Sequence, residues 1–292
     1  TGYDFPALAS GAVVKRELAN GTIANGQSFA FNLRRAKFQD PRVREAIGLM
    51  CNYEWSNTTL FYGLYARING FFENSELAAT GLPSPEERAL MHGQTLIRST
   101  LLRSIAKGET LKVEFLEDDP AFDRIVNPFV ENLRALGVDA SLSRVDPAQM
   151  EARTRFQDGP DPEKTYDFDI ITKQFPTGYE PGANLRQYFG TDGVKDVFNQ
   201  QGLSDPAVDA LILKIMQANT KADIITGAKA LDRVMRALRF WVPQWYKDTH
   251  TVAYFDMYEH PEVLPPYALG ELDFWWYNAE KGDALRASGA LK

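Results

Sequence analysis

The sequence predicts an α/β fold with a doubly wound sheet, because strand-like and helix-like segments alternate along its central part. Residues 111–116 and 138–142 alternate apolar with polar side chains, as half-buried strands do. The segment between them, residues 120–137, carries apolar side chains at helical spacing and ends at Gly137. A strand, a helix and a strand with short joints predict a parallel pair with a right-handed crossover.

The segment before this unit predicts one strand and one helix. Residues 29–33 are strand-like, and Asp40 followed by Pro41 is typical of a helix N-terminus. Four side chains then fall at helical spacing and predict a buried face, namely Val43, Ile47, Met50 and Cys51. Residues 68–88 are rich in turn formers, so we expect a long ordered surface loop there.

The segment after the unit adds further strands and helices. Asp146 is the expected cap of a helix, and residues 168–171 form the expected third strand. Residues 205–218 and 222–240 show helical spacing. From about residue 245 the chain is dense in aromatic residues and prolines without a helical period, so a second structural context is expected to begin there.

Composition excludes several classes of protein. The net charge of -7 over 292 residues, without a dense basic run, argues against a nucleic-acid partner. No stretch approaches the roughly 18 apolar residues of a membrane span, so the protein is not expected to span a membrane. Cys51 is the single cysteine, and we expect a buried, inert thiol without a disulfide. The first residues show no signal peptide and no initiator Met, so a processed or truncated start at Thr1 is expected.

Known catalytic and metal-binding patterns are missing from the sequence. His92, His250 and His260 share no ligand spacing, and no phosphate-binding glycine loop or nucleophile elbow occurs. Adjacent acidic residues such as Asp167 and Asp169 are interpreted as charges that flank a strand. We therefore expect no catalytic residue, no metal site and no cofactor, although remote carboxylates of a glycosidase would leave no local pattern.

The stretch "DFDIITKQFPTGYEPGANLRQYF" at residues 167–189 is the first place to look for a ligand site. Its strand breaks into a loop with two glycines, two prolines, aromatic side chains and charges. Loops at the carboxyl ends of buried strands are where open α/β sheets hold ligands. The two glycines allow a close approach of another backbone.

Several stretches resemble one family of proteins. The run "NLRRAKFQDPRVREA" at residues 32–46 resembles a segment of the bacterial extracellular solute-binding proteins of family 5, which serve peptide and nickel ABC transporters. "FFENSELAATGLPSPEE" at residues 71–87 and "LPPYALGELDFWWYN" at residues 264–278 resemble the branch linked to murein peptides and microcin C. Family members are considerably longer, and only their C-terminal part matches.

The resemblance implies the type II periplasmic binding protein fold, in which two lobes close on a ligand. Residues 28–246 are then expected to form the second lobe, and residues 1–27 and 247–292 to belong to the first. The implied function is the substrate-binding component of an ABC importer. Its expected partners are a peptide or peptide-like ligand and an inner-membrane permease, and the expected state is a periplasmic monomer.

The resemblance also nominates residues for the ligand site. Gln174, Phe175 and Pro176 are expected to face the ligand at the strand end. Thr177 stands where relatives place an Asp that holds the amino group of a peptide, so that anchor is expected to be missing. Glu180 is close enough in sequence to replace it. The ligand is therefore expected to be peptide-like without being held as a free-amine oligopeptide is.

Further candidates carry weaker signals. Asn184 follows the loop, and Arg186 is either a bidentate carboxylate ligand or a solvated charge. Trp245 and Tyr246 are cleft aromatics or core residues, and Phe72 is cleft wall or packing. Two alternatives stay open for the function: the same fold with a sugar derivative, opine or metal chelate as ligand, or a structural or interaction protein without transport.

Overall fold

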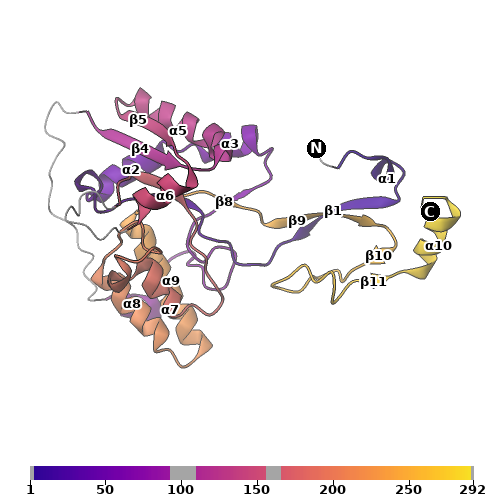
Figure 1. Cartoon of the computed structure of the whole chain (residues 1–292). Helices are drawn as coiled ribbons and strands as arrows, with labels where there is room; N and C mark the ends of the chain where they lie inside the picture. The colour runs from indigo at the N-terminus through magenta and orange to yellow at the C-terminus, as the bar shows by residue number, and fades with distance from the viewer. Residues whose placement is uncertain (1–2, 93–109, 156–165, 291–292) are drawn as a thin grey trace. The chain divides into compact units, whose positions relative to one another are not determined.

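A computed structural model describes most of the chain, namely residues 3–92, 110–155 and 166–290 (Figure 1). The chain divides into two compact units. Unit 1 comprises residues 1–23 and 247–292, and unit 2 comprises residues 24–246. The two units are described separately below.

A mixed sheet forms the centre of unit 2. Its order among the described residues is β5–β4–β6–β2–β7, with bounds Asp139–Arg144, Lys112–Glu117, Ile170–Lys173, Ser28–Phe31 and Trp241–Pro243. β4 pairs in parallel with β5 and β6, which confirms the predicted parallel pair. β2 runs antiparallel to both β6 and β7, so the sheet is mixed.

Helix α5 (Asp123–Ala135) covers one face of the sheet. Its buried side chains, among them Phe129 and Leu133, join one core with Phe29 and Phe115. The rings of Phe29 and Phe115 meet edge to face, with centroids 5.9 Å apart. Burying each such ring contributes roughly 1.5–3 kcal/mol, so this face holds the sheet and its crossover helix together.

An aromatic cluster and three helices lie on the other side of unit 2. Because successive strand residues point to opposite faces, Trp241 points away from the core that contains Val242. The rings of Phe71, Phe175 and Phe240 lie next to Trp241, and the ring of Phe189 packs against those of Phe175 and Phe240. Figure 1 shows α7, α8 and α9 gathered there, with bounds Ala183–Phe189, Pro206–Met216 and Lys221–Leu238.

The expected helix starts are confirmed. The Asp40 carboxylate accepts from the Arg42 N–H at the start of α2 (Pro41–Leu49). Asp146 caps α6 (Pro147–Thr154) in the same way. Each cap satisfies an N–H that the helix itself leaves unpaired, a contribution of about 1 kcal/mol. The other helices of unit 2 are α3 (Tyr53–Leu60) and α4 (Pro85–Met91).

The loop predicted at the surface over residues 68–88 is in fact anchored in the core. Phe71 and Phe72 are fully buried, and the last part of the segment forms α4. The buried Asp232 carboxylate accepts from the Phe71 N–H at 2.8 Å and from the Ala79 N–H at 3.2 Å. The turn-rich composition predicted a loop correctly, but it did not predict that the apolar side chains of this loop are buried.

The described part of unit 1, residues 3–23 and 247–290, consists of strands and two α-helices. β1 (Val13–Ala19) and β9 (Thr249–Phe255) form an antiparallel ladder over seven residue pairs, from Val13 with Phe255 to Ala19 with Thr249. The other elements are α1 (Pro6–Ala9), β10 (Tyr258–Glu259), β11 (Trp276–Tyr277) and α10 (Ala279–Ala287). β10 pairs with β11, and part of the aromatic-rich segment after residue 245 therefore forms short strands.

Candidate ligand-binding site

One edge of the unit 2 sheet brings together polar side chains from four strands. β4, β6 and β7 end at this edge and β2 begins there, because β2 runs against its neighbours. We call it the carboxyl edge and define it by five residues: Gln27, Glu117, Lys173, Gln174 and Gln244. This is the kind of edge at which α/β sheets bind ligands.

Three glutamine side chains form a chain of hydrogen bonds along the carboxyl edge. The Gln174 Nε2 donates to Gln27 Oε1 at 3.1 Å, and the Gln27 Nε2 donates to Gln244 Oε1 at 2.7 Å. The strand register explains the contact, since Ser28 lies opposite both Lys173 and Pro243. Amide groups can donate to and accept from a peptide main chain, so the row suits a neutral polar ligand.

Lys173 places a cation at the end of β6. Its Nζ donates to Gln200 Oε1 at 2.7 Å. Burial lowers the pKa of the Lys173 ammonium to about 8. No carboxylate pairs with this ammonium among residues 3–92, 110–155 and 166–290. An anionic group of a ligand would therefore compensate a buried charge that the described protein leaves uncompensated.

Glu117 is the last residue of β4 and is almost fully buried. Its carboxyl accepts a hydrogen bond from the hydroxyl of Thr172 on the neighbouring strand. Burial raises the pKa of Glu117 to about 7, although the Thr172 hydrogen bond opposes that effect. The carboxyl edge therefore carries a group that gains or loses a proton near neutral pH.

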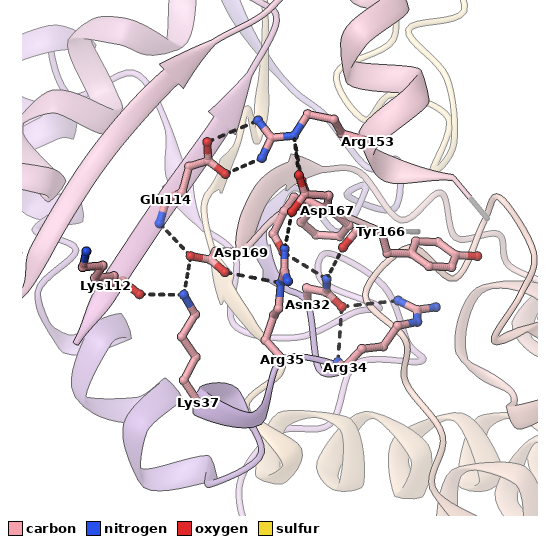
Figure 2. Close-up of polar contacts among 11 residues, drawn as sticks. Asn32, Arg34, Arg35, Lys37, Lys112, Glu114, Arg153, Tyr166, Asp167 and Asp169 are labelled. Atoms are coloured by element: carbon pink, nitrogen blue, oxygen red, sulfur yellow. Dashed lines mark hydrogen bonds and ion pairs between the residues drawn. The ribbon is translucent and has the colours of Figure 1, made fainter. Parts of the chain in front are cut away.

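The opposite edge of the sheet is closed by a network of ion pairs and hydrogen bonds (Figure 2). Asp169 accepts from Lys37 Nζ at 2.5 Å and from the Glu114 N–H at 2.9 Å. Arg153 pairs with Glu114 at 2.6 Å, and Arg35 pairs with Asp167 at 2.6 Å. These charges satisfy one another, which confirms their interpretation as strand-flanking charges.

A hollow of about 540 Å³ lies near α2 and the end of α9. Its charged side chains already have protein partners. Arg42 pairs with Asp40, and Arg239 pairs with Glu45. Arg44 donates to backbone carbonyls, among them that of Arg239 at 3.0 Å. We therefore place the candidate site at the carboxyl edge.

Phe175 does not face a ligand, contrary to the expectation. Its side chain is fully buried in the aromatic cluster, with its ring centroid 5.2 Å from that of Phe189. Its N–H and its carbonyl are both hydrogen-bonded to Gly26, so its main chain is occupied as well. Phe175 lies two residues after the end of β6, and its apolar side chain packs in the core. Phe72 is likewise fully buried.

The rest of the loop lies closer to solvent. Gln174 and Pro176 are exposed, and the Thr177 hydroxyl donates to the Ala24 carbonyl at 3.4 Å. Glu180 is exposed. Asn184 accepts from the Leu185 N–H at 3.0 Å at the start of α7. The loop therefore runs along residues 24–27 and is hydrogen-bonded to them through Gln174, Phe175 and Thr177.

Arg186 is occupied in this structure. The exposed guanidinium pairs with Asp192, which follows α7 directly. This contact agrees with the interpretation of Arg186 as a solvated charge.

Trp245 and Tyr246 form β8, which pairs with β3 (Ala66–Arg67). Both side chains are half-buried. The Trp245 ring packs on Phe61, with centroids 4.7 Å apart, and Trp245 also lines a cavity. Trp245 thus makes a core contact and lines a cavity, and its contact with a ligand stays a prediction.

Sequence reasoning missed Gln27, Glu117 and Gln244, and it did not nominate Lys173. Gln27 lies directly before β2, and Gln244 lies directly after β7. Their only sequence signal is that position. The antiparallel register that brings them to Gln174 is a long-range property, which local patterns do not contain.

Comparison with known proteins agrees with this architecture. Residues 4–196 match the profile of the family described as bacterial extracellular solute-binding proteins, family 5 middle. The match covers more than half of the chain. The chain therefore belongs to this family of solute-binding proteins, as the sequence motifs indicated.

Among curated relatives, the probable peptide-binding protein YejA of Agrobacterium fabrum is 32% identical over 94% of this chain and 50% of its own length. A peptidoglycan-binding protein of the same organism, YepA, is 24% identical, again over 94% of this chain and 50% of its own length. The chain thus spans about half the length of the curated relatives that it matches.

Solved structures show the same fold at lower identity. The oligopeptide-binding protein AppA from Bacillus subtilis, in complex with a nonapeptide, aligns over 93% of this chain and 53% of its own, with a TM-score of 0.63 and 13% identity. The murein tripeptide-binding protein MppA of Escherichia coli aligns over 93% of this chain and 51% of its own, with a TM-score of 0.58 and 15% identity. The expected type II periplasmic binding protein fold is therefore confirmed.

Proposed function

We propose that this chain is part of the substrate-binding component of an ABC importer and that it binds peptides or peptide-like solutes. The observation that carries the proposal is the carboxyl edge, where the exposed Gln174 begins a hydrogen-bonded chain of amides and the buried Lys173 ammonium has no carboxylate partner among the described residues. Family membership and a relative named as a probable peptide-binding protein support it. The protein presents its ligand to a permease and performs no catalysis.

The proposed binding residues are the accessible residues of the stretch 167–189, together with residues at the ends of the neighbouring strands. They are Gln174, Pro176, Thr177, Glu180, Asn184, Arg186, Trp245 and Tyr246, joined by Gln27, Lys173 and Gln244. Phe175 and Phe72 are left out because the core buries both side chains. Thr177 carries no charge, so the ligand's amino group has no Asp partner at that position.

The two-lobed plan of the family supplies a mechanism for signalling. We assign residues 28–246 to the second lobe, and residues 1–27 and 247–292 to the first. Ligand contacts to both lobes of a complete receptor would stabilise the closed form. That form would dock as a periplasmic monomer on an inner-membrane permease. Within the described ranges, no helix is both long and apolar enough to cross a membrane.

A thermal-shift panel on the purified chain tests the proposal. Its ligands are murein tripeptide, mixed tripeptides, an oligosaccharide mixture and a nickel–histidine chelate. A peptide at a hundredfold its dissociation constant stabilises the protein by about 2.7 kcal/mol. For a protein of this size that corresponds to a rise in melting temperature of about 5 °C. No response to any peptide, or a response to the sugars or the chelate alone, would reject the proposed ligand class.

A matched pair of variants locates the response. Gln174→Ala removes an exposed amide from the carboxyl edge, and Gln149→Ala removes an exposed amide from α6. We expect Gln174→Ala to weaken peptide affinity about tenfold, the loss of one or two hydrogen bonds. Gln149→Ala is expected to bind as the wild type does. Equal affinities for both variants would place the ligand away from the carboxyl edge.

A further inference from the structure

A cavity of about 300 Å³ lies beside the carboxyl edge, within unit 2. It is formed by the first turn of α3, by α5 and by the joint between β7 and β8. Its aromatic and apolar walls come from six residues: Tyr53, Trp55, Ile125, Pro128, Phe129 and Trp245. Aromatic and apolar side chains combined with polar groups, here among them Asn132 and Gln244, are typical of small-molecule sites.

Most polar groups in the wall already have partners in the protein. The Asn132 side chain donates to the Met50 carbonyl at 2.9 Å, and the Tyr53 hydroxyl donates to the Tyr65 carbonyl at 2.6 Å. Glu131 pairs with Arg134 at 2.8 Å. Burial raises the pKa of the Cys51 thiol to about 11, so this wall residue is uncharged. The cavity therefore suits a neutral group.

Gln244 differs from Asn132, Tyr53 and Glu131 in this respect. Gln244 is 1% exposed, and its amide nitrogen is buried without a hydrogen-bond partner among the residues that the structure describes. Its Oε1 accepts from Gln27, and its N–H and carbonyl bond to Gln27 and Ile68. A buried donor without an acceptor is destabilising, and a small shift of the Gln244 side chain into the cavity would let an acceptor oxygen of a ligand compensate it.

The hydrogen-bonded chain of glutamines links this cavity to the loop after β6. It runs from the exposed Gln174 through Gln27 to Gln244, where the last donor is left over. Trp245 follows Gln244 directly and forms part of the cavity wall. Hydrogen bonds between the glutamine side chains therefore connect the cavity wall to the carboxyl edge.

We propose that this cavity is a specificity subsite that takes an aromatic or large apolar side chain of a peptide ligand, whose neighbouring carbonyl oxygen accepts from the Gln244 amide. The proposal rests on the proposed function. The size agrees, because an apolar cavity of about 150 Å³ is enough to hold a benzene ring. A charged side chain is disfavoured, since the wall offers no free counter-charge and desolvation would be uncompensated.

The test fills the cavity from α3. Ser56 lies in the wall and is buried, whereas Thr59 lies exposed on the same helix. Ser56→Phe should block the cavity, and Thr59→Phe is the matched control. Affinities for Ala-Phe-Ala and Ala-Ala-Ala are measured by titration calorimetry on the purified chain. The wild type and Thr59→Phe should prefer Ala-Phe-Ala at least tenfold, and Ser56→Phe should lose that preference while still binding Ala-Ala-Ala.

A second variant and a second probe keep the test decisive if Ser56→Phe does not fold. Gln244→Met keeps the size of the side chain but removes the donor, and it should weaken Ala-Phe-Ala binding about tenfold. N-acetyl-L-phenylalaninamide should also change the fluorescence of Trp55 and Trp245 in the wild type.

Three results would overturn the subsite. The first is wild-type binding of both tripeptides with equal affinity, which leaves the proposed function standing. The second is an unchanged preference in Ser56→Phe or Gln244→Met, which would mean that water alone fills the cavity. The third is no binding of any peptide to the wild type, which would reject the proposed function as well.

Discussion

Glu117 makes the stability of this protein depend on pH in a direction that most carboxylates do not share. Its carboxyl is 1% exposed at the end of β4, and burial raises its pKa from 4.5 to about 7. The folded protein therefore holds this proton more tightly than the unfolded chain does. Glu117→Gln removes the ionisation and keeps an oxygen that can accept from Thr172.

The magnitude follows from the two pKa values. Each pKa unit corresponds to about 1.4 kcal/mol, so the difference between 4.5 and about 7 is worth about 3 kcal/mol. This contribution to folding is fully present below pH 4.5 and is lost as the pH rises through about 7. Relative to the wild type, Glu117→Gln should therefore gain about 3 kcal/mol of unfolding free energy between pH 4.5 and pH 8.

Urea unfolding at pH 4.5 and pH 8 measures this gain as a shift in the midpoint of about 1 M or more. Asp139→Asn, which removes an exposed carboxylate from the neighbouring strand β5, is the control and should show no such change between the two pH values. If the difference between Glu117→Gln and the wild type were the same at both pH values, the Glu117 carboxyl would not be held protonated by burial.

Two further predictions concern the core that supports the site. Phe175→Ala should lower the unfolding free energy by about 3–5 kcal/mol because it empties the aromatic cluster, and its peptide affinity, measured well below the melting temperature, should stay within twofold of the wild type. A large loss of affinity in a folded Phe175→Ala protein would return this residue to the site. Asp232→Ala should lower the free energy of unfolding, measured in urea, by about 3 kcal/mol, because the N–H groups of Phe71 and Ala79 lose their buried acceptor. A decrease below about 0.5 kcal/mol would show that these N–H groups find another acceptor.

Local sequence rules predicted much of unit 2. The Asp-Pro pairs at residues 40–41 and 205–206 mark the starts of α2 and α8 because Asp accepts from the first N–H groups and Pro needs no acceptor there. Gly137 ends α5 with a φ of 84°, a conformation that glycine adopts without strain. These features depend on neighbouring residues alone, so the sequence contains them in full.

The candidate site was predicted less well because it depends on register and on burial. Gln27 and Gln244 are 217 positions apart in the sequence, and only the antiparallel pairing of β2 with β7 brings them together. Phe175 lies in the expected loop, but the cluster of rings on that face of the sheet buries its side chain. The sequence pattern of a strand predicts where the strand ends and therefore where a ligand loop can begin. Which side chains of that loop stay accessible depends on long-range packing, which the local pattern does not contain.

The central claim is that the carboxyl edge of unit 2 binds a peptide. A crystal structure of the chain with Ala-Phe-Ala bound tests it most directly. The peptide should contact Gln174 and Lys173, with its phenylalanine side chain in the cavity beside Trp245 and a carbonyl oxygen within hydrogen-bond distance of Gln244 Nε2. A peptide bound away from these residues would contradict it.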